Sequence, residues 1–151
     1  MQSILCFGDS NTWGLNPRDN SRFDDQTRWT GLLDDLLRPF GKRVIEEGLC
    51  GRTTQFHDWY RKNRCGLDAF PLLLESHSPL AGVVIMLGTN DCKTCFHASA
   101  EQIAEACASW YGRQSMPACR KFWWCPLSCW DMAWRSLTAS STRTPSHSPT
   151  V

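Results

Sequence analysis

The sequence predicts an α/β protein built on a parallel sheet with helices on both faces, in three α/β/α layers, and incomplete at its C-terminus. Short apolar runs typical of buried strands occur at residues 4–7, 43–45 and 83–87. Segments with the apolar spacing of helices separate these runs, as in folds where crossover helices join parallel strands. A loop of glycine and polar residues follows each run directly. Such loops leave the carboxyl ends of parallel strands and meet at one crevice.

The first predicted helix lies between the first two strands. Its apolar residues recur at helical spacing from Trp29 to Leu37, and Pro39 and Gly41 end the run. A strand precedes this helix and another follows it. The chain therefore begins as a strand–helix–strand unit, which is the building block of a flavodoxin-like sheet.

Two further helices are expected after the second strand. A helix at 68–76 would hold Pro71 in its first turn, where proline is tolerated because the missing N–H has no helical partner there. Ser99 and Gln102 have the spacing of a capping box, which predicts a helix that reaches Cys107.

Length, charge and cysteine content exclude several classes of protein. The length of 151 residues suits one domain with one core, and the net charge of +1 predicts neither a nucleic-acid nor a membrane partner. The longest apolar run, residues 81–87, is far shorter than the ~20 residues of a membrane span, and no signal peptide is evident. We therefore expect a cytoplasmic protein whose nine cysteines are thiols.

The loops that follow the three strands carry the residues that are best suited to catalysis. They are Gly8-Asp9-Ser10, the segment 48–54 with Gly51 at its centre, and the segment 88–91, which contains Asn90. If these loops meet at one crevice, they bring together a hydroxyl, a glycine turn and a side-chain amide. Those groups make up most of an ester-cleaving site, although no recognisable base follows them.

Residues 108–151 differ in character from residues 1–107. They hold five of the eight tryptophans and a Ser/Thr/Pro-rich end, and no strand or helix period is sustained. We therefore divide the chain into an N-terminal part of an α/β domain, 1–107, and an atypical tail, 108–151, that is not native to the fold. Unless this tail pairs with it, the strand at 83–87 would remain an exposed edge, which favours aggregation.

The genetic code suggests an origin for the tail. Tryptophan has a single codon, so residues 122–126 can be partly back-translated. Read from the third base of the Phe122 codon, they give Leu-Val-Val followed by Ser or Pro, whichever synonymous codons were used. This product reads as the buried parallel strand that the fold needs next. We hypothesise a frameshift in the gene near residues 104–109.

The three loops and their strands resemble blocks I, II and III of the SGNH (GDSL-type) hydrolases, and are most similar to the bacterial arylesterase/acyltransferase branch. The resemblance covers about residues 2–106, roughly the first half of a usual family member. Three blocks in order, each following a strand, are far more specific than a lone Gly-Asp-Ser tripeptide. The longer strings that carry it are residues 4–10 with 12–14, 28–31, 46–49 with 52–54, and 86–91.

The resemblance implies an activity and roles for four residues. Ser10 would be the nucleophile, and its N–H, the N–H of Gly51 and the side chain of Asn90 would form the oxyanion hole. Trp13 would line an apolar substrate pocket, whereas Trp29 fits core packing better. The implied substrate is a small carboxylic ester. The resemblance implies no cofactor and no metal, and it allows for an oligomer.

The chain departs from the family at the catalytic base. The family supplies Asp and His from a late Asp-x-x-His block, and no aspartate here has a histidine three residues on. An unactivated serine is a poor nucleophile, so we expect weak or absent activity. None of the four histidines has the position of a base; they are His57, His77, His97 and His147.

Two alternative functions remain open from the sequence. One is an SGNH-like module without catalysis. The other is a cysteine-rich zinc-binding protein, in which Cys92 and Cys95 would combine with Cys125 and Cys129 as four thiolate ligands.

Overall fold

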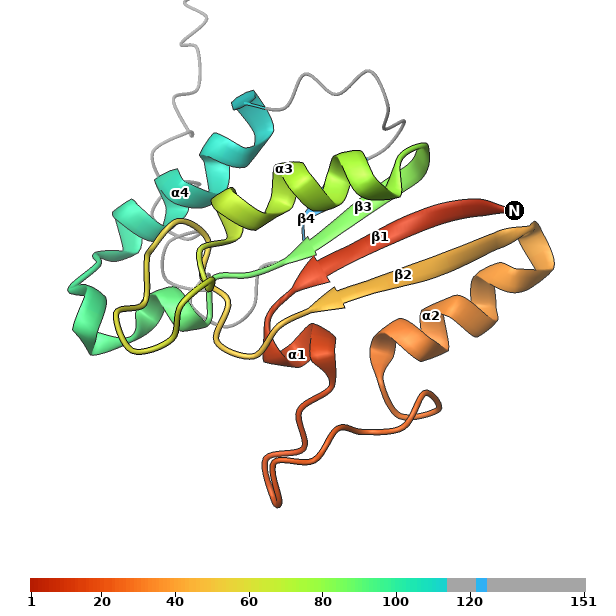
Figure 1. The fold of residues 1–151 in the computed structure, drawn as a ribbon, viewed down its shortest axis with the longest axis horizontal. Helices are drawn as coiled ribbons and strands as arrows, with labels where there is room; N and C mark the ends of the chain where they lie inside the picture. The colour runs from red at the N-terminus through yellow and green to blue at the C-terminus, as the bar shows by residue number, and fades with distance from the viewer. Residues whose placement is uncertain (114–121, 125–151) are drawn as a thin grey trace, which may run out of the picture.

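The computed structural model describes residues 1–113 and 122–124, and strands and helices alternate in it as the sequence predicts (Figure 1). In chain order the elements are β1 (Gln2–Gly8), α1 (Ser10–Trp13), α2 (Trp29–Leu37), η1 (Arg38–Phe40), β2 (Lys42–Gly48), α3 (Gly66–His77), β3 (Leu80–Met86), η2 (Asn90–Cys92), η3 (Thr94–Phe96), α4 (Ala100–Arg113) and β4 (Phe122–Trp124), where η denotes a 3-10 helix.

The four strands form one parallel sheet in the order β2-β1-β3-β4. Leu5 in β1 lies beside Ile45 in β2 and Val83 in β3, so β1, the most buried strand, occupies an inner position. The predicted parallel α/β fold is confirmed. β4 pairs with β3 from Val83 to Ile85. The sequence predicts that residues 83–87 remain an exposed edge unless the tail pairs with them, and a short segment beyond residue 108 does pair with three residues of β3.

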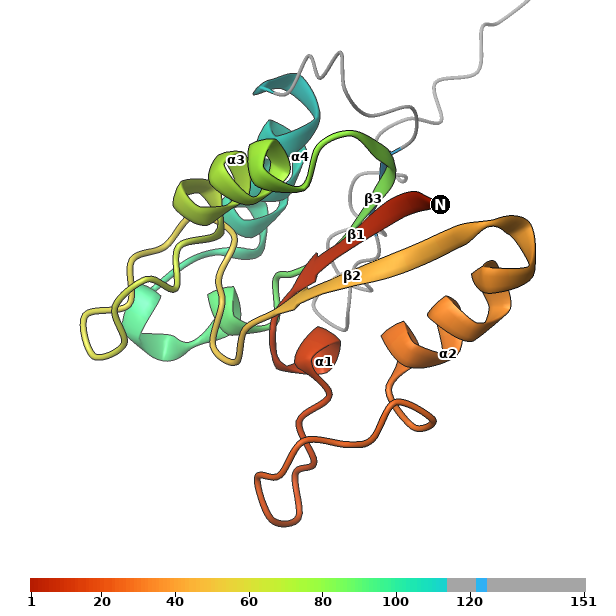
Figure 2. The ribbon, with the colours of Figure 1, turned by 45° about the vertical axis from the view of Figure 1, so that its right-hand side comes forward.

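Helices lie on both faces of the sheet, as expected. Figures 1 and 2 show α3 and α4 on one face, and α2 on the other with α1 at the carboxyl ends of the strands. Alternate residues of a strand point to opposite faces, so one set of β1 and β3 side chains meets α3 and α4. This set forms the main core with one aromatic residue from each helix; its buried members are Leu5, Phe7, Phe70, Leu80, Val83, Ile85, Leu87 and Trp110.

The ends of two helices agree with the sequence prediction. α2 spans Trp29–Leu37, and Gly41 follows in the left-handed conformation at φ +68°. At the start of α4, Gln102 N–H donates to Ser99 Oγ at 3.2 Å, while Gln102 Oε1 accepts from the Ser99 N–H at 2.8 Å. This reciprocal pair is the predicted capping box.

The start of α3 differs from the prediction. α3 begins at Gly66, so Pro71 is its sixth residue and lies in the second turn rather than the first. The earlier start is stabilised from outside the helix, because the N–H groups of Gly66 and Leu67 donate to the carbonyls of Thr53 and Thr54 at 3.1 and 3.0 Å. These bonds satisfy first-turn donors that have no partner within a helix.

α4 continues past residue 107 to Arg113, and Trp110 is only 1% exposed. The segment after residue 107 therefore contributes one side chain to the main core. The division of the chain at residue 107 remains a prediction.

Among the helices in the described ranges, none is long and apolar enough to span a bilayer.

Candidate active site

The three loops predicted to carry the chemistry are joined to one another by hydrogen bonds. The Leu49 N–H after β2 donates to the carbonyl of Gly8 at 3.0 Å, and the Asp9 N–H donates to the carbonyl of Met86 at 3.3 Å. Asn90 Nδ2 donates to the carbonyl of Arg52 at 3.0 Å. Each loop is thus fixed to the other two at the carboxyl edge of the sheet, where sequence reasoning placed them.

Ser10 is the first residue of the short helix α1. Its predecessor Asp9 is fully buried and caps this helix, since Asp9 Oδ1 accepts from the N–H and the side-chain amide of Asn11 at 2.9 and 3.1 Å. Gly8 lets the turn form, because a Cβ there would lie 2.0 Å from Thr12 Oγ1 and 2.7 Å from the Met86 carbonyl oxygen. Ser10 itself is half-buried at the start of the helix.

Three hydrogen-bond donors are available around this serine. Gly51 has φ +87°, a conformation that favours glycine, and within the described residues neither its N–H nor that of Ser10 has an acceptor. Asn90 uses one amide proton on Arg52 and has a second. The three hydrogen-bonded loops thus carry the donors that the sequence predicts for an oxyanion hole, and that role remains a prediction.

Asp91 holds the third loop against the second. It is fully buried and accepts from the Thr54 N–H at 2.9 and 3.1 Å and from the Thr54 hydroxyl. Burial raises the pKa of Asp91, and the bonds from Thr54 partly oppose that rise. Burial also raises the pKa of Asp9, against the hydrogen bonds from Asn11. Both carboxyls are fully buried, and each accepts hydrogen bonds that fix its loop.

Arg52 lies among the loops of the candidate site, and sequence reasoning included it in the second loop without giving it a role. Its Nη1 donates to the carbonyl of Gly8 at 3.0 Å and to that of Glu47, and its guanidinium lies 4.1 Å from the centre of the Phe7 ring. It is only 4% exposed, and burial lowers the pKa of Arg52 to about 10. A signal existed in the sequence, since the arginine directly follows the predicted oxyanion glycine.

The described histidines have partners other than Ser10. His77 Nε2 lies 2.8 Å from Glu47 Oε1, and His57 Nδ1 lies 3.6 Å from Asp68 Oδ2. His97 ends η3 in the left-handed conformation at φ +49°. Within residues 1–113 and 122–124, none of these rings bonds the serine hydroxyl. His147 falls outside the described residues.

The cysteines correct one expectation. Cys92 is disulfide-bonded, so the prediction that all nine cysteines are thiols is wrong at this position. A disulfide sulfur is not a thiolate, which argues against the zinc site built on Cys92 and Cys95. Cys125 and Cys129 lie outside the described residues. The free thiols in the described part are those of Cys6, Cys50, Cys65 and Cys95.

The described residues contain one other arrangement of potential metal donors. His57, Cys65 and Asp68 offer ligand atoms within 4.8 Å of one another, and His57 and Asp68 are exposed. No sequence pattern singled out this trio.

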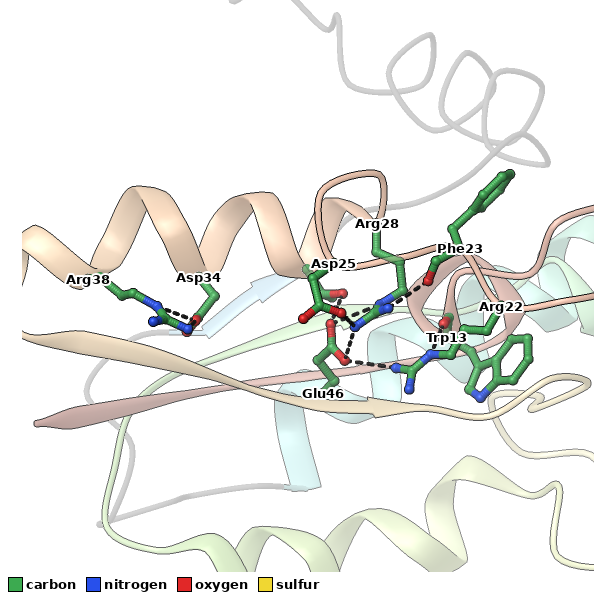
Figure 3. A network of polar contacts seen from close by, with 9 residues as sticks. Trp13, Arg22, Phe23, Asp25, Arg28, Asp34, Arg38 and Glu46 are labelled. Carbon is green, nitrogen blue, oxygen red and sulfur yellow. Dashed lines mark hydrogen bonds and ion pairs between the residues drawn. The ribbon is translucent and has the colours of Figure 1, made fainter.

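Trp13 belongs to a polar network on the α2 side of the sheet (Figure 3). The Arg22 guanidinium lies 5.5 Å from the Trp13 ring, and Arg22 Nε donates to the Trp13 carbonyl at 2.7 Å. Arg22 and Arg28 both contact Glu46 of β2, at 2.8 and 3.0 Å. Trp29 is half-buried at the start of α2, and its indole N–H has no partner in the described part.

A polar cavity of about 320 Å³ lies beside this network, between α2 and β2. Neither Trp13 nor any of Ser10, Gly51 and Asn90 lines it, so it is distinct from the candidate site. Its lining residues are Asp25, Arg28, Thr30, Gly31, Asp34, Asp35, Arg38, Val44 and Glu46.

Comparison with known proteins identifies the family to which the chain is similar. Residues 6–144 match the model of the GDSL-like Lipase/Acylhydrolase family. No curated protein matches the chain. This family match covers most of the chain, including all three loops.

Three solved structures illustrate the similarity. The M. smegmatis aryl esterase is 36% identical with a TM-score of 0.72, and the match covers 80% of this chain and 62% of that protein. Est24, a carbohydrate acetylesterase from Sinorhizobium meliloti, is 38% identical with a TM-score of 0.72 and the same coverage, 80% and 62%. A putative arylesterase from Agrobacterium tumefaciens is 37% identical with a TM-score of 0.69, covering 74% and 54%.

The loops, the sheet and these matches together define an α/β carboxylic ester hydrolase fold. The chain belongs to the GDSL-like lipase/acylhydrolase (SGNH) family. It spans less than two thirds of the length of each of the three solved relatives.

Proposed function

We propose that the chain is a serine ester hydrolase that cleaves small carboxylic esters through an acyl-enzyme on Ser10. The single observation that carries this proposal is the hydrogen-bonded convergence of the Ser10, Gly51 and Asn90 loops at one edge of the sheet. The names of the solved relatives, aryl esterase and carbohydrate acetylesterase, support the class of substrate.

The proposed reaction has two halves. Ser10 Oγ attacks the ester carbonyl carbon, and the oxyanion accepts hydrogen bonds from the N–H groups of Ser10 and Gly51 and from Asn90 Nδ2. Collapse of this intermediate breaks the bond to the alcohol oxygen and leaves the acyl group on Ser10. The alcohol leaves with the proton that Ser10 Oγ gave up, which solvent water carries because no base among the described residues is bonded to the serine. Water then releases the carboxylic acid, while transfer to another alcohol would make the protein an acyltransferase. Trp13 is proposed to contact the substrate.

The rate should be low because the base is missing. Oxyanion donors and binding alone leave a residual acceleration of about 10³–10⁴ over water in hydrolases stripped of their triad. Weak hydrolysis is therefore the expected activity. A module without catalysis is the competing proposal, and it is favoured by the absence of a histidine bonded to Ser10 among the described residues.

Hydrolysis of 4-nitrophenyl acetate by three variants tests the proposal. Ser10→Ala should lose the acetyl group that mass spectrometry detects on Ser10 of the parent, although binding and the oxyanion donors alone still sustain slow hydrolysis. Asn90→Ala should lower turnover by about 10²-fold because one oxyanion donor is lost. Ser21→Ala, at an exposed turn, is the control and should keep the parent rate. A parent that gains no acetyl group and hydrolyses the ester no faster than buffer would favour the module without catalysis.

We also propose that residues 108–151 arise from a frameshift. The support for this proposal is that a strand forms where the shifted reading frame would encode one. β4 at Phe122–Trp124 pairs with β3 in parallel, and the shifted frame of the same codons gives Leu-Val-Val. Nucleotide sequence around the codons for residues 100–151 would decide the matter. A one-base correction that opens a frame with a later Asp-x-x-His would support the proposal. An unchanged frame in close relatives would refute it.

A further inference from the structure

We propose that Arg61 and Arg64 form an anion-binding subsite beside the oxyanion hole, and that the preferred ester carries a carboxylate or phosphate group. This inference rests on the proposed esterase function, because it assigns the charge of the substrate that the same site would take. Neither the family match nor the relatives' names assign such a charge.

The subsite lies directly over Gly51. A Cβ placed on Gly51 would lie 2.8 Å from Arg61 Nη1 and 3.6 Å from Arg64 Nε. The side of the glycine that bears no side chain therefore faces two guanidinium groups. A substrate whose carbonyl oxygen reaches the Gly51 N–H passes within a few ångströms of these charges.

Neither guanidinium is neutralised by an acid within the described residues. Arg64 donates to the backbone carbonyls of Cys50 and Lys62 at 2.9 and 2.8 Å. The Arg61 side chain is exposed and forms no ion pair in the described part. The nearest candidate, Asp58, contacts Lys93 at 3.2 Å and accepts from backbone N–H groups, including that of Arg61.

Arg52 is a third arginine near the subsite, because the positive charge of Arg64 is close enough to contribute to the lowered pKa of Arg52. It is 4% exposed, and its Nε has no hydrogen-bond partner in the described part of the chain. The acids that act on Arg52 are Glu47 and Asp9, and Glu47 is itself bonded to His77. A buried donor without a partner is costly, and Arg52 forms no ion pair with an acid in the described part of the chain, so its positive charge adds to the field at this end of the site.

The residue type indicates the chemistry of the ligand. A guanidinium presents several N–H donors in a planar fork that matches two oxygens of a carboxylate or phosphate. Lysine at position 61 would provide charge without that fork. The arrangement therefore favours a substrate that carries a carboxylate or phosphate group over one with a neutral sugar or alkyl chain.

Binding to the Ser10→Ala protein tests the subsite without needing turnover. Two matched pairs of esters serve as probes: monomethyl adipate with methyl hexanoate, which differ on the acyl side, and 4-acetoxybenzoate with its methyl ester, which differ on the alcohol side. Ligand-observed NMR at low salt measures each affinity. The anionic member of at least one pair should bind about tenfold more tightly.

Variants then attribute the preference. Arg61→Gln should remove most of the difference, Arg61→Lys should keep part of it, and Lys62→Gln, one residue along the same loop, should leave it intact. Equal affinities within both pairs would overturn the subsite, as would an equal preference in Arg61→Gln and the parent. Circular dichroism of each variant verifies the fold.

Activity distinguishes the failure of this inference from the failure of the esterase proposal. If the parent hydrolyses both members of each pair at equal rates, the esterase stands and the subsite fails. If the parent hydrolyses none, yet the anionic probes bind selectively, the subsite stands and the esterase fails. If Arg61→Gln slows neutral and anionic esters equally, the arginine serves the oxyanion alone, which also overturns the proposed specificity.

Discussion

The two faces of the sheet are held by different physical interactions. On the face covered by α3 and α4, Leu5, Phe7, Val83 and Ile85 are fully buried against aromatic rings. On the face covered by α2, Ile4 and Cys6 of β1 are also buried, but β2 adds a carboxylate beside Val44. This carboxylate, Glu46, contacts two arginines and a threonine.

The side chains of β3 are also less exposed on the aromatic face than on the α2 face. Val84 and Met86 of β3 point to the α2 face and remain half-buried, whereas their neighbours on the opposite face are inaccessible. The comparison teaches that the aromatic face provides most of the apolar stabilisation. The other face depends on a polar network whose strength should change with pH.

The largest effect is expected from the aromatic face. Phe7 lies between Phe70 and Trp110, with ring centres 5.0 and 5.9 Å away. Phe7→Ala should lower the free energy of unfolding by about 3–5 kcal/mol, because a large buried ring leaves a cavity. Urea denaturation measures the loss. A cost as small as that of Phe40→Ala, at an exposed position, would contradict the described core.

Glu46→Gln should disrupt the polar network on the α2 face and lower the free energy of unfolding by less than Phe7→Ala does. The change leaves Arg28, whose side chain is 9% exposed, with weaker partners, and we expect a loss of about 1–3 kcal/mol. Asp35→Asn is the matched control and should be near neutral, because the Asp35 side chain is exposed and its ion pair with Arg38 is long, at 3.8 Å. Equal stability of Glu46→Gln and the control would show that the network contributes nothing.

The network should also weaken in acid. Burial raises the pKa of Glu46, but hydrogen bonds from Thr30 and Arg28 and the charges of Arg28 and Arg22 outweigh it and hold the pKa below the ordinary value of 4.5. A lowered folded pKa means that the stabilisation is complete above 4.5 and is lost as the pH falls through the folded pKa. The difference in unfolding free energy between parent and Glu46→Gln should therefore shrink below that pH. A difference that is constant with pH would contradict the assignment.

The smallest expected difference in stability is between alanine substitutions at two neighbouring valines of β3. Val83 and Val84 are sequence neighbours on opposite faces of β3, one inaccessible and one half-buried. Val83→Ala should cost about 1 kcal/mol more than Val84→Ala, because only the first leaves a closed cavity. Parallel thermal or urea melts measure the difference. Equal costs would show that the two faces are packed alike.

Much of the fold followed from local patterns. The apolar strands, the helix that ends at Gly41 and the capping box at Ser99 depend on neighbouring residues, and the structure confirms them. The start of α3 did not follow, because it depends on carbonyls of Thr53 and Thr54 that are distant in sequence. β4 did not follow from its own residues either, since pairing with β3 rather than periodicity defines it.

The site was predictable in position but not in detail. Strand ends predicted where Ser10, Gly51 and Asn90 would lie, since parallel strands place their loops at one edge. The buried contacts of Arg52 and the approach of Arg61 to Gly51 depend on side-chain paths that no local spacing encodes. The same holds for the disulfide at Cys92.

Covalent labelling of Ser10 tests the central claim most directly. The protein would be incubated with an alkyl fluorophosphonate, and the modified residue would be located by mass spectrometry of peptides. The account predicts slow, single labelling at Ser10 that disappears in Ser10→Ala and is unchanged in Ser21→Ala. Absence of labelling, or labelling at another residue with Ser10 unmodified, would contradict the assignment of Ser10 as the nucleophile.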